Sequence, residues 1–510
     1  MPSALRTLPD TALVTGWDFS TGAVKCLAFD LAGNVVAEVR FPTDLWTEGG
    51  VSEFNMLQLE GQARATTRGM AAALKKLGRL NDWVAGGISA THHTAGRVDA
   101  LGNQVRRMVC WNDQTLAKYH AKGMERLGGP DAVQKLIGGP WAIRYSLSHL
   151  VKDEETLSAD DWTRTARMTC HGVAAAGYLT GAFDVTSVSS AASTGLMDFR
   201  TNQWAAGMLN ALASEEYRTQ ALASLPAIIQ DMNQPIGPLS EATAADAGLP
   251  AGLRPLVFPT LDDQAAGLVG GGAVDAGQVA IILGNSAVVN SSAAAAPQSG
   301  TLDAMKLNWG PYLWMRCYSN GAQFLDRVVG TKPDWEKLEK AARAVPPGCH
   351  GVSVLPFVLS EPSVGVTEPR VQWFPGEPAD VGVKFRAALE AIAYLIALAV
   401  KEHESAGTKV TRVTISGGIA KSQLMGEILA SVLNRPLERL QSSEGTALGA
   451  AVVALAGFEN HNRKRQGITE AYTVADAVQK LVRFATPVSP AGAWTGAYAV
   501  GVEAFKKKIA

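Results

Sequence analysis

The stretch TGWDFSTGAVKCLAFD, Thr15 to Asp30, sets an Asp, a Ser, a Thr and a Gly between two short apolar runs. A further apolar run, VVAEV, follows the turn residues LAGN. Short runs of Val, Leu, Phe and Cys that are interrupted by Gly and Asn are typical of strands joined by tight turns. The opening of the chain therefore predicts an antiparallel meander with a polar turn between its first two strands.

The residue types in that turn suit a phosphate site. A tight turn directs several backbone amides toward one point, where phosphate oxygens can bind. Ser20 and Thr21 add hydroxyl donors, Gly22 lets a ligand come close, and Lys25 can neutralise negative charge. Asp18 fits such a site when a Mg²⁺ ion lies between its carboxylate and the phosphates. Taken alone, however, the segment favours an ordinary hairpin whose Asp and Ser bond their own backbone.

Beyond the meander, strand-like and helix-like segments alternate, which indicates an α/β protein. Residues 55–78, NMLQLEGQARATTRGMAAALKKLG, predict a helix that Gly78 ends. Its apolar face carries Met56, Leu59, Ala63, Met70, Leu74 and Leu77. Residues 387–400, AALEAIAYLIALAV, contain a Glu and fall short of the ~20 residues that span a bilayer. We expect a buried helix there.

The length of 510 residues exceeds what one hydrophobic core usually serves, so we expect two domains. The Pro- and Gly-rich stretch AGLPAGLRPLVFPT places the boundary near residue 253, giving domains 1–252 and 253–510. Within the second domain, GQVAIILGNSAVVNSSA repeats the arrangement of the opening, with a polar turn at Gly284, Asn285 and Ser286 between two apolar strands. This repetition suggests two related lobes that each contribute a polar hairpin turn.

Composition excludes several classes of function. The chain has 46 Lys plus Arg against 47 Asp plus Glu, which leaves no electrostatic footprint for nucleic acid or an acidic membrane. Its five cysteines are scattered without a CxxC pair, which argues against a disulfide framework or a structural zinc site. The first residues lack the apolar run of a signal peptide. We expect a soluble, cytoplasmic protein.

Two adjacent carboxylates begin the segment LDDQAAGLVGGG. Adjacent side chains point in different directions, so one of Asp262 and Asp263 can face a cleft while the other caps the following helix. In isolation, two helix caps are the simpler interpretation. A cleft carboxylate beside a phosphate donor is the base that phosphoryl transfer requires. His92 and His93 could join these carboxylates at a metal, but neighbours on an extended strand face opposite ways, which disfavours that site.

Five segments, in this order along the chain, resemble motifs of the FGGY carbohydrate kinases. They are GWDFSTGAVK; THHTAGRVDALGNQVRRMVCWND; LDDQAAGLVGGG; LGNSAVV; and ISGGIAKSQLMGEILASVLNRPL with EGTALGAAVVALAG. The resemblance extends over roughly residues 12 to 457, and the xylulokinase-like branch is the most similar. It implies two ribonuclease-H-like lobes, as in actin and the heat-shock chaperones, that close on a cleft for ATP-Mg²⁺ and a sugar.

The resemblance also implies roles for individual residues. Asp263 would be the catalytic base and would contact the acceptor, while Asp262 stands where the family usually has Gly. Asp18 would hold Mg²⁺ through water. The sugar pocket would be lined by His93, Asp113 and Trp111. The nucleotide would be bound by Ser20, Thr21, Gly22, Lys25, Gly284, Asn285 and Ser286 on the phosphate side, and by Gly417, Gly418 and Ser422 beside adenosine.

The chain departs from the family's pattern mainly around the acceptor. Residues 91–94, Thr-His-His-Thr, replace the usual Gln-Met-His-Gly, Thr115 replaces a common Arg, Ser20 a frequent Gly, and Asn285 a usual Thr. We expect an ATP- and Mg²⁺-dependent kinase acting on the terminal hydroxyl of a small ketose, D-xylulose first, and a homodimer. Two alternatives stay open: a kinase for ribulose, a deoxyhexulose, glycerol or erythritol, and a non-catalytic nucleotide-binding switch.

Overall fold

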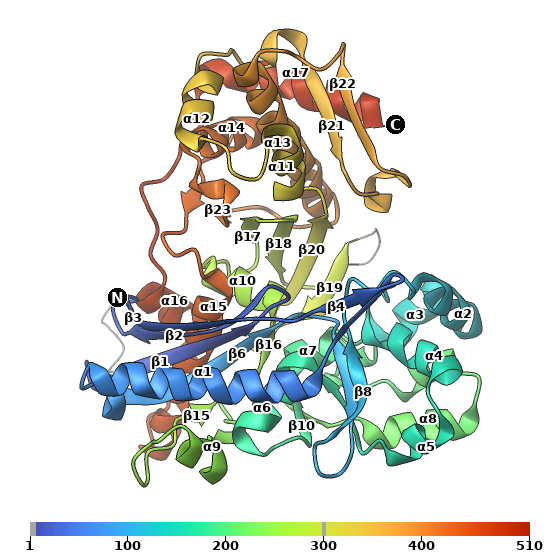
Figure 1. Ribbon diagram of the computed structural model, residues 1–510, viewed down its shortest axis with the longest axis vertical. Helices are drawn as coiled ribbons and strands as arrows, with labels where there is room; N and C mark the ends of the chain where they lie inside the picture. Colours follow the sequence, from blue (N-terminus) through green and yellow to red (C-terminus); the bar gives the residue numbers. More distant parts are fainter. Residues whose placement is uncertain (1–6, 298–301, 510) are drawn as a thin grey trace.

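The computed structural model describes residues 7–297 and 302–509 as two lobes stacked along the long axis of the molecule (Figure 1). The lower lobe in this view contains the N-terminal strands, and the upper lobe contains helices of the C-terminal half. Each lobe is built on a mixed sheet flanked by helices, which confirms the predicted α/β class.

The first sheet has the strand order β14-β15-β6-β1-β2-β3, and β16 also pairs with β6. β1, β2 and β3 form the predicted antiparallel meander. β6 runs parallel to β1, and β15 and β16 run parallel to β6. The bounds of these strands are β1 (Leu13–Phe19), β2 (Ala23–Asp30), β3 (Val35–Pro42), β6 (Trp83–Ala90), β14 (Gly237–Pro238), β15 (Leu256–Val257) and β16 (Leu261–Asp262).

Helix α1 (Met56–Lys76) covers this sheet and shows how the local sequence sets its ends. The side chain of Asn55 caps it by accepting a hydrogen bond from the Leu57 amide, and Gly78 leaves the helix with a φ of 70°. The predicted apolar face is buried except at Leu77, which is 53% exposed. Leu77 is the C-terminal cap residue and lies beyond the last turn, so its assignment to that face was wrong.

The remainder of the first lobe surrounds a five-stranded sheet of order β4-β5-β8-β7-β9. Its strands are β4 (Trp46–Glu48), β5 (Val51–Phe54), β7 (Ala95–Val98), β8 (Gln104–Val109) and β9 (Arg167–Cys170). Two short strand pairs are β10 (Val185–Ser187) with β13 (Ala227–Ile229) and β11 (Met197–Asp198) with β12 (Gln203–Trp204). The helices are α2 (Ala117–Leu127), α3 (Pro130–Ile137), α4 (Ser146–Thr156), α5 (Ala159–Arg164), α6 (His171–Thr180), α7 (Val188–Ala192), α8 (Glu215–Ser224) and α9 (Glu241–Asp246).

The second large sheet repeats the core of the first. Its order is β19-β20-β18-β17-β23-β24. The antiparallel hairpin β17-β18 lies beside the parallel strand β23, as the hairpin β1-β2 lies beside β6, which matches the predicted repetition. The strands are β17 (Gln278–Leu283), β18 (Ala287–Ala293), β19 (Asp303–Lys306), β20 (Tyr312–Tyr318), β23 (Arg412–Ser416) and β24 (Glu438–Arg439), with a separate hairpin of β21 (Ser353–Phe357) and β22 (Arg370–Phe374).

The upper lobe is completed by helices, of which α13 (Val381–Ser405) holds the apolar run at 387–400 and is largely buried, as predicted. In the parts of the chain that the structure describes, no helix combines the length and apolarity needed to cross a bilayer. The other helices of the C-terminal half are α10 (Asp263–Gly270), α11 (Ala322–Val329), α12 (Trp335–Arg343), α14 (Gln423–Leu433), α15 (Gly445–Arg465), α16 (Val474–Leu481) and α17 (Gly492–Ile509).

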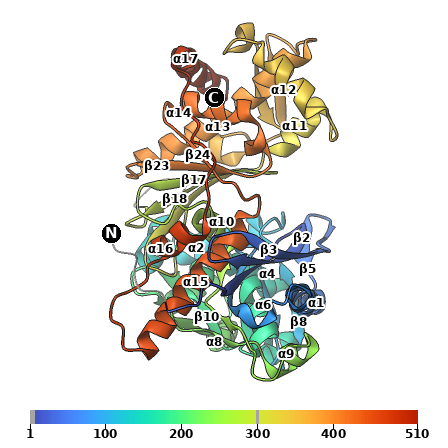
Figure 2. The same cartoon turned by 90° about the vertical axis from the view of Figure 1, so that its left-hand side faces the viewer.

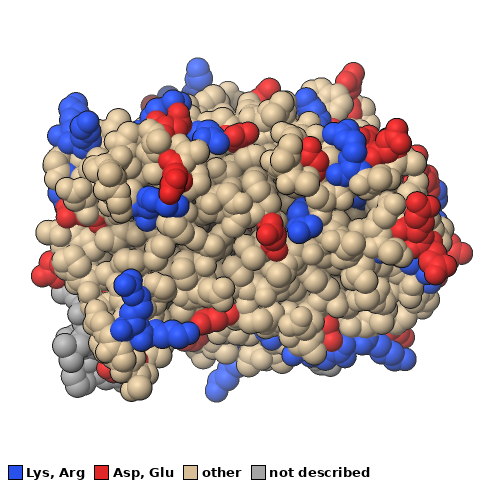
Figure 3. Space-filling model, turned by 90° about the horizontal axis from the view of Figure 1, so that it is seen from below, with Lys and Arg blue, Asp and Glu red and all other residues tan. Residues whose placement is uncertain are grey.

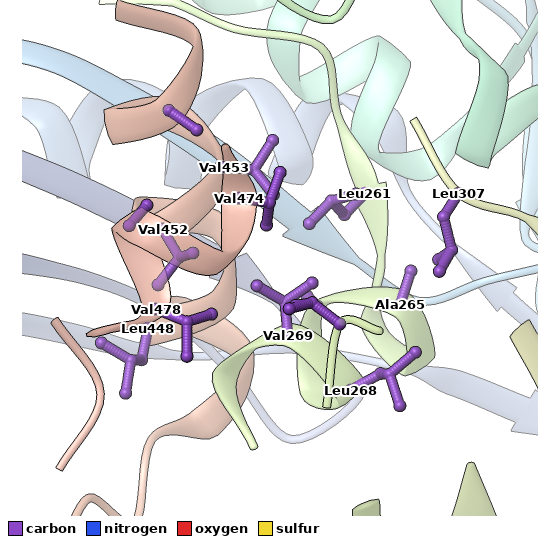
Figure 4. Close-up of a cluster of buried hydrophobic side chains, with 14 of the residues drawn as sticks. Leu261, Ala265, Leu268, Val269, Leu307, Leu448, Val452, Val453, Val474 and Val478 are labelled. Atoms are coloured by element: carbon purple, nitrogen blue, oxygen red, sulfur yellow. The ribbon is translucent and has the colours of Figure 1, made fainter. Parts of the chain in front are cut away.

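Helices α10 and α15 pack against each other near the junction of the lobes. Glycines allow the close approach: a Cβ at Gly449 would lie 1.9 Å from the carbonyl oxygen of Ala266, and one at Gly16 of β1 would lie 1.8 Å from that of Ala447. Apolar side chains of α10, α15 and α16, including Val269, fill the space around them (Figure 4). Although α15 lies late in the chain, it packs on β1 and β6 of the first sheet. Figure 2 shows this helix in the lower lobe, together with the N-terminal strands.

The sheets also locate the transition between lobes along the chain. β15 and β16 pair with β6 of the first sheet, and β17 is the first strand of the second. The change of sheet therefore falls between Asp262 and Gln278, after the predicted boundary at residue 253. On the face viewed from below, basic and acidic side chains are interspersed and lie mostly toward the rim (Figure 3).

Candidate active site

The ends of three parallel strands bring the predicted catalytic residues together. In the registers of the first sheet, Asp18 of β1 lies opposite Ser89 of β6, and Asp262 of β16 lies opposite Ala90. The carboxyl ends of β1, β6 and β16 therefore meet at one edge. Asp18, the turn at residues 91–94 and Asp263 all lie there. The negative charge of Asp263 helps to raise the pKa of Asp18.

Of Asp262 and Asp263, Asp262 is the one that caps α10, so the simpler interpretation that both cap the helix was wrong. Asp262 is buried and caps α10 by accepting a hydrogen bond from the Ala265 amide at 2.9 Å. Burial raises the pKa of Asp262 to about 6. The side chain of Asp263 is 20% exposed and points toward His92, just after the end of β6. Asp263 is thus the carboxylate of the pair that solvent can reach.

His92 is the partner of Asp263. Its Nδ1 lies 2.8 Å from Asp263 Oδ1, and its backbone N–H lies 3.4 Å from the same oxygen. The prediction that His92 and His93 face opposite ways was wrong, because they occupy a turn after β6 in which His93 has a φ of 57°. Their ring centroids are 3.9 Å apart. Among residues 7–297 and 302–509, no cluster of three His, Cys, Asp or Glu side chains could hold a metal.

His93 is held as a neutral imidazole. Its Nδ1 lies 2.6 Å from the carbonyl oxygen of Ser193, which can only accept, so Nδ1 carries the hydrogen. The ring stacks on Tyr145 with centroids 4.2 Å apart, and burial lowers the pKa of His93 well below its ordinary value. Its Nε2 is a buried acceptor without a hydrogen-bond partner in the described chain.

The turn after β8 carries Trp111 and Asp113. It adjoins the His92–His93 turn, because the hydroxyl of Thr94 lies 3.7 Å from Cys110 Sγ. Trp111 is partly buried against the core of the first lobe. Asp113 is buried, and its carboxylate accepts from the backbone and hydroxyl of Thr115 and from Lys152 Nζ at 2.9 Å. Thr115 and Lys152 therefore fix the carboxylate of Asp113.

Asp18 and Lys25 lie on adjacent strands of the first hairpin. Burial raises the pKa of Asp18, although Lys25, at 3.4 Å, opposes the rise. Asp18 also accepts a hydrogen bond from the Ser89 hydroxyl at 3.1 Å. Lys25 Nζ lies 2.6 Å from Glu444 Oε2; burial alone would lower the pKa of Lys25, but Asp18 and Glu444 raise it. Glu444 also binds Arg40 at 2.7 Å and so links the start of α15 to the first hairpin.

The first hairpin turn is closed by one of its side chains and leaves open space beside others. Ser20 donates its hydroxyl to the carbonyl oxygen of Ala23 at 2.8 Å, so this side chain closes the turn as in an ordinary hairpin. Thr21 is partly exposed. A Cβ at Gly22 would find open space within 4 Å. The turn thus leaves room beside Thr21 and Gly22.

The second hairpin turn lies next to the glycine pair after β23, because β17 and β23 are parallel neighbours. Gly417 adopts a φ of +96°, and a Cβ there would lie 2.4 Å from the carbonyl oxygen of Leu283. Gly284 and Asn285 are held from the other side, since their carbonyl oxygens accept hydrogen bonds from Ala322 and Gly321 at the start of α11. Ser286 completes the turn before β18.

A cleft of about 940 Å³ lies between Lys25 and Arg40 of the first lobe and the residues of the upper lobe around Gly284 and Gly418. Asp18, Asp263 and the first hairpin turn at residues 20–22 do not line it. Its lining includes five residues that the sequence assigns to nucleotide: Lys25, Gly284, Asn285, Gly418 and Ser422. Ser422 caps α14 and donates to Glu339, whose carboxylate also accepts from the Leu424 amide at 2.9 Å.

Other lining residues were missed by sequence reasoning, among them Arg40, Trp335 and Glu339. No motif marks them, because Trp335 and Glu339 lie on a surface helix that reaches the cleft only in the folded chain.

Residues 13–270 match the FGGY family of carbohydrate kinases, N-terminal domain, and residues 283–458 match the FGGY family of carbohydrate kinases, C-terminal domain. The chain belongs to this family. The resemblance seen in the sequence is confirmed, and this FGGY protein is a carbohydrate kinase. Individual members are more distant, as the following relatives show.

The FGGY kinase is 26% identical over 492 residues to a xylulose kinase of Streptomyces rubiginosus, covering 92% of this chain and 93% of that one. It is 28% identical over 488 residues to a glycerol kinase of Methylorubrum extorquens, with 88% and 89% covered. The crystal structure of xylulose kinase from Rhodospirillum rubrum superposes with a TM-score of 0.82 at 20% identity, over 97% of this chain and 98% of that one. That likeness confirms the two-lobe, actin-like ATPase fold.

Proposed function

We propose that this FGGY kinase transfers the γ-phosphoryl group of ATP to the terminal hydroxyl of a small ketose, with D-xylulose as the acceptor. The observation that carries the proposal is the position of Asp263. Its partly exposed carboxylate lies at the strand edge that also holds Asp18 and His93. The name of the Streptomyces rubiginosus relative supports xylulose as the acceptor. The glycerol kinase of Methylorubrum extorquens, at 28% identity, keeps glycerol as the alternative to test.

Asp263 acts as the general base in this proposal. Its carboxylate takes the proton of the acceptor hydroxyl as the hydroxyl oxygen bonds to the γ-phosphorus. The bond from the γ-phosphorus to its bridging oxygen breaks, and ADP leaves. The transition state of phosphoryl transfer is loose, so positioning and charge neutralisation supply most of the catalysis.

The phosphate chain and the nucleotide would occupy the cleft between the lobes. The turns at 20–22 and 284–286 would offer backbone amides to the phosphates, and Lys25 would contribute positive charge. Gly417, Gly418 and Ser422 would lie beside adenosine. We therefore place ATP along the cleft of about 940 Å³, which Lys25, Gly284, Asn285, Gly418 and Ser422 line.

Mg²⁺ would be held at Asp18. The residues fit this ion, because Mg²⁺ in such sites binds one or two carboxylates together with substrate phosphates and water, and the carboxylate of Asp18 lies at this edge near that of Asp263. The ion would neutralise charge on the phosphate oxygens. The protein's own contribution is to hold the Asp18 carboxylate through Ser89.

The acceptor would lie against His93, Trp111 and Asp113. The unpartnered Nε2 of His93 is an acceptor, so it fits a hydroxyl donor of a sugar. Trp111 would form a wall of the pocket. Asp113, fixed by Thr115 and Lys152, would keep its carboxylate in one orientation.

The proposal is tested by measuring ATP turnover with Mg²⁺ on D-xylulose, ribulose, a deoxyhexulose, glycerol and erythritol. We expect turnover to depend on the acceptor and to be fastest with D-xylulose. A higher kcat/KM on another acceptor would reassign the substrate. Sugar-independent ATP hydrolysis without a phosphorylated sugar would favour a nucleotide-binding switch. We further propose that the enzyme is a cytoplasmic homodimer.

A further inference from the structure

The side chain of His92 makes its polar contact with Asp263. This contact bears on how Asp263 acts as the base, a role that rests on the proposed function. An ionised carboxylate can only accept, so the 2.8 Å contact to Asp263 Oδ1 places the imidazole hydrogen on Nδ1 of His92. The other ring nitrogen, Nε2, is buried and has no hydrogen-bond partner among the residues described. Asp263 is therefore the polar group that orients this imidazole.

The contact is one-sided on the carboxylate as well. Both donors of His92, Nδ1–H and the backbone N–H at 3.4 Å, approach Oδ1. Within the described chain no hydrogen bond reaches Oδ2. A carboxylate held by one oxygen presents the other in a fixed direction, which is what a base needs before its substrate arrives.

We propose that His92 is a positioning residue for the catalytic base. Its Nδ1–H fixes Oδ1 of Asp263 and leaves Oδ2 as the oxygen that takes the proton of the acceptor hydroxyl. His92 does not exchange a proton in this step.

The surroundings of His92 prevent the imidazole from turning away. The ring is 7% exposed and packs edge-on against His93, which itself stacks on Tyr145. The turn that carries both histidines is tied down at Thr91, whose hydroxyl lies 2.7 Å from His171 Nδ1 and 3.1 Å from the hydroxyl of Thr94. The donor is thus rigid before substrate binds.

Two substitutions separate the donor from the bulk of the ring. His92→Leu removes Nδ1–H and keeps an apolar side chain, whereas His92→Asn keeps an N–H near the position of Nδ1. We expect kcat to fall about tenfold to hundredfold in His92→Leu, the range of a hydrogen bond to a charged group. KM for the acceptor should stay within about twofold, because a positioning residue does not bind the ground state. His92→Asn should recover most of kcat.

His120→Leu is the matched control. His120 bonds the carbonyl oxygen of Trp141 at 2.9 Å in the first lobe, away from Asp263, so its loss removes an imidazole hydrogen bond without touching the base. An unchanged kcat in His92→Leu would overturn the proposal. So would an equal loss in His92→Asn, or a rise in KM alone, which would make His92 an acceptor ligand.

A second measurement does not require turnover. With ¹⁵N-labelled histidine, the wild type should show His92 protonated at Nδ1, and Asp263→Asn should shift that nitrogen while His120 stays in place. Protonation at Nε2, or no response to Asp263→Asn, would overturn the proposal even where the wild type phosphorylates none of the acceptors tested. Absence of turnover on every acceptor would instead contradict the proposed function.

Discussion

Gly417 and Gly418 provide a direct test of how the nucleotide side of the cleft is built. An alanine at Gly417 would keep a φ of +96° and place its Cβ 2.4 Å from the carbonyl oxygen of Leu283. The left-handed backbone costs an L-residue roughly 1–2 kcal/mol, and forcing a methyl group into a packed site costs about 1–3 kcal/mol. Gly417→Ala should therefore lower the free energy of unfolding by about 2–5 kcal/mol.

Gly418 is the matched control. Its φ of −61° and ψ of −45° suit any residue, and a Cβ there would meet nothing within 4 Å. Gly418→Ala should change the free energy of unfolding by about 0.5 kcal/mol or less. Urea denaturation of both variants measures the difference.

Gly417→Ala should also weaken ATP binding. Leu283 directly precedes the turn at 284–286, so a displaced end of β17 would move that turn. Calorimetric titration with ATP measures this effect. Equal urea midpoints for Gly417→Ala and Gly418→Ala would refute the packing argument at Leu283.

Three further predictions concern charged groups at the site. Asp262 keeps its proton to about pH 6 in the folded chain but only to its ordinary 3.8 when unfolded, so its contribution to stability is lost as pH rises through this window. Asp262→Asn keeps the helix cap. By urea denaturation it should be about 3 kcal/mol more stable than the wild type at pH 7.5 and equally stable at pH 3.5. Stability equal to that of the wild type at both pH values would contradict the burial argument. Lys25→Met should raise the Kd for ATP about tenfold or more in calorimetric titration. Lys75→Met, at the exposed end of α1, is the control and should leave this Kd unchanged. Equal Kd values for the two variants would contradict the assignment of Lys25 to the phosphate site. Asp18→Asn should raise the Mg²⁺ concentration for half-maximal turnover about tenfold to hundredfold, and an unchanged Mg²⁺ dependence would place the ion elsewhere.

The sequence predicts best where a contact is local. The meander, the hairpin at Gly284 and the capped helix α1 follow from apolar spacing and turn residues over a few positions. The local sequence did not decide between Asp262 and Asp263, since two helix caps were the simpler interpretation, and only the family resemblance singled out Asp263.

Contacts between distant segments were beyond sequence reasoning. Lys25 pairs with Glu444, 419 residues away, and nothing in the motif EGTALGAAVVALAG marks Glu444 as a partner of the first hairpin. His92 was considered only as a metal ligand on an extended strand. Its contact with Asp263 depends on the turn after β6, which requires the positive φ of His93. The signal in the sequence was that His92 stands where the family motif that it resembles usually has Met.

The roles of Asp18, Lys25, the sugar-lining residues and the nucleotide-binding residues stay predictions that the substitutions above test. The structure brings Asp18, the His92–His93 turn and Asp263 to one strand edge and Lys25, Asn285, Gly418 and Ser422 to one cleft. Ser20 is the predicted ligand whose side chain the fold already uses, since its hydroxyl closes the hairpin.

The most direct test of the central claim is the rate of Asp263→Asn on the best acceptor, measured together with the binding of ATP and of the sugar. Asparagine keeps the size of the side chain and removes the base. We predict that kcat falls about 10²-fold or more while both ligands still bind, as the loss of a general base requires. A kcat close to that of the wild type would contradict the assignment of Asp263 as the base.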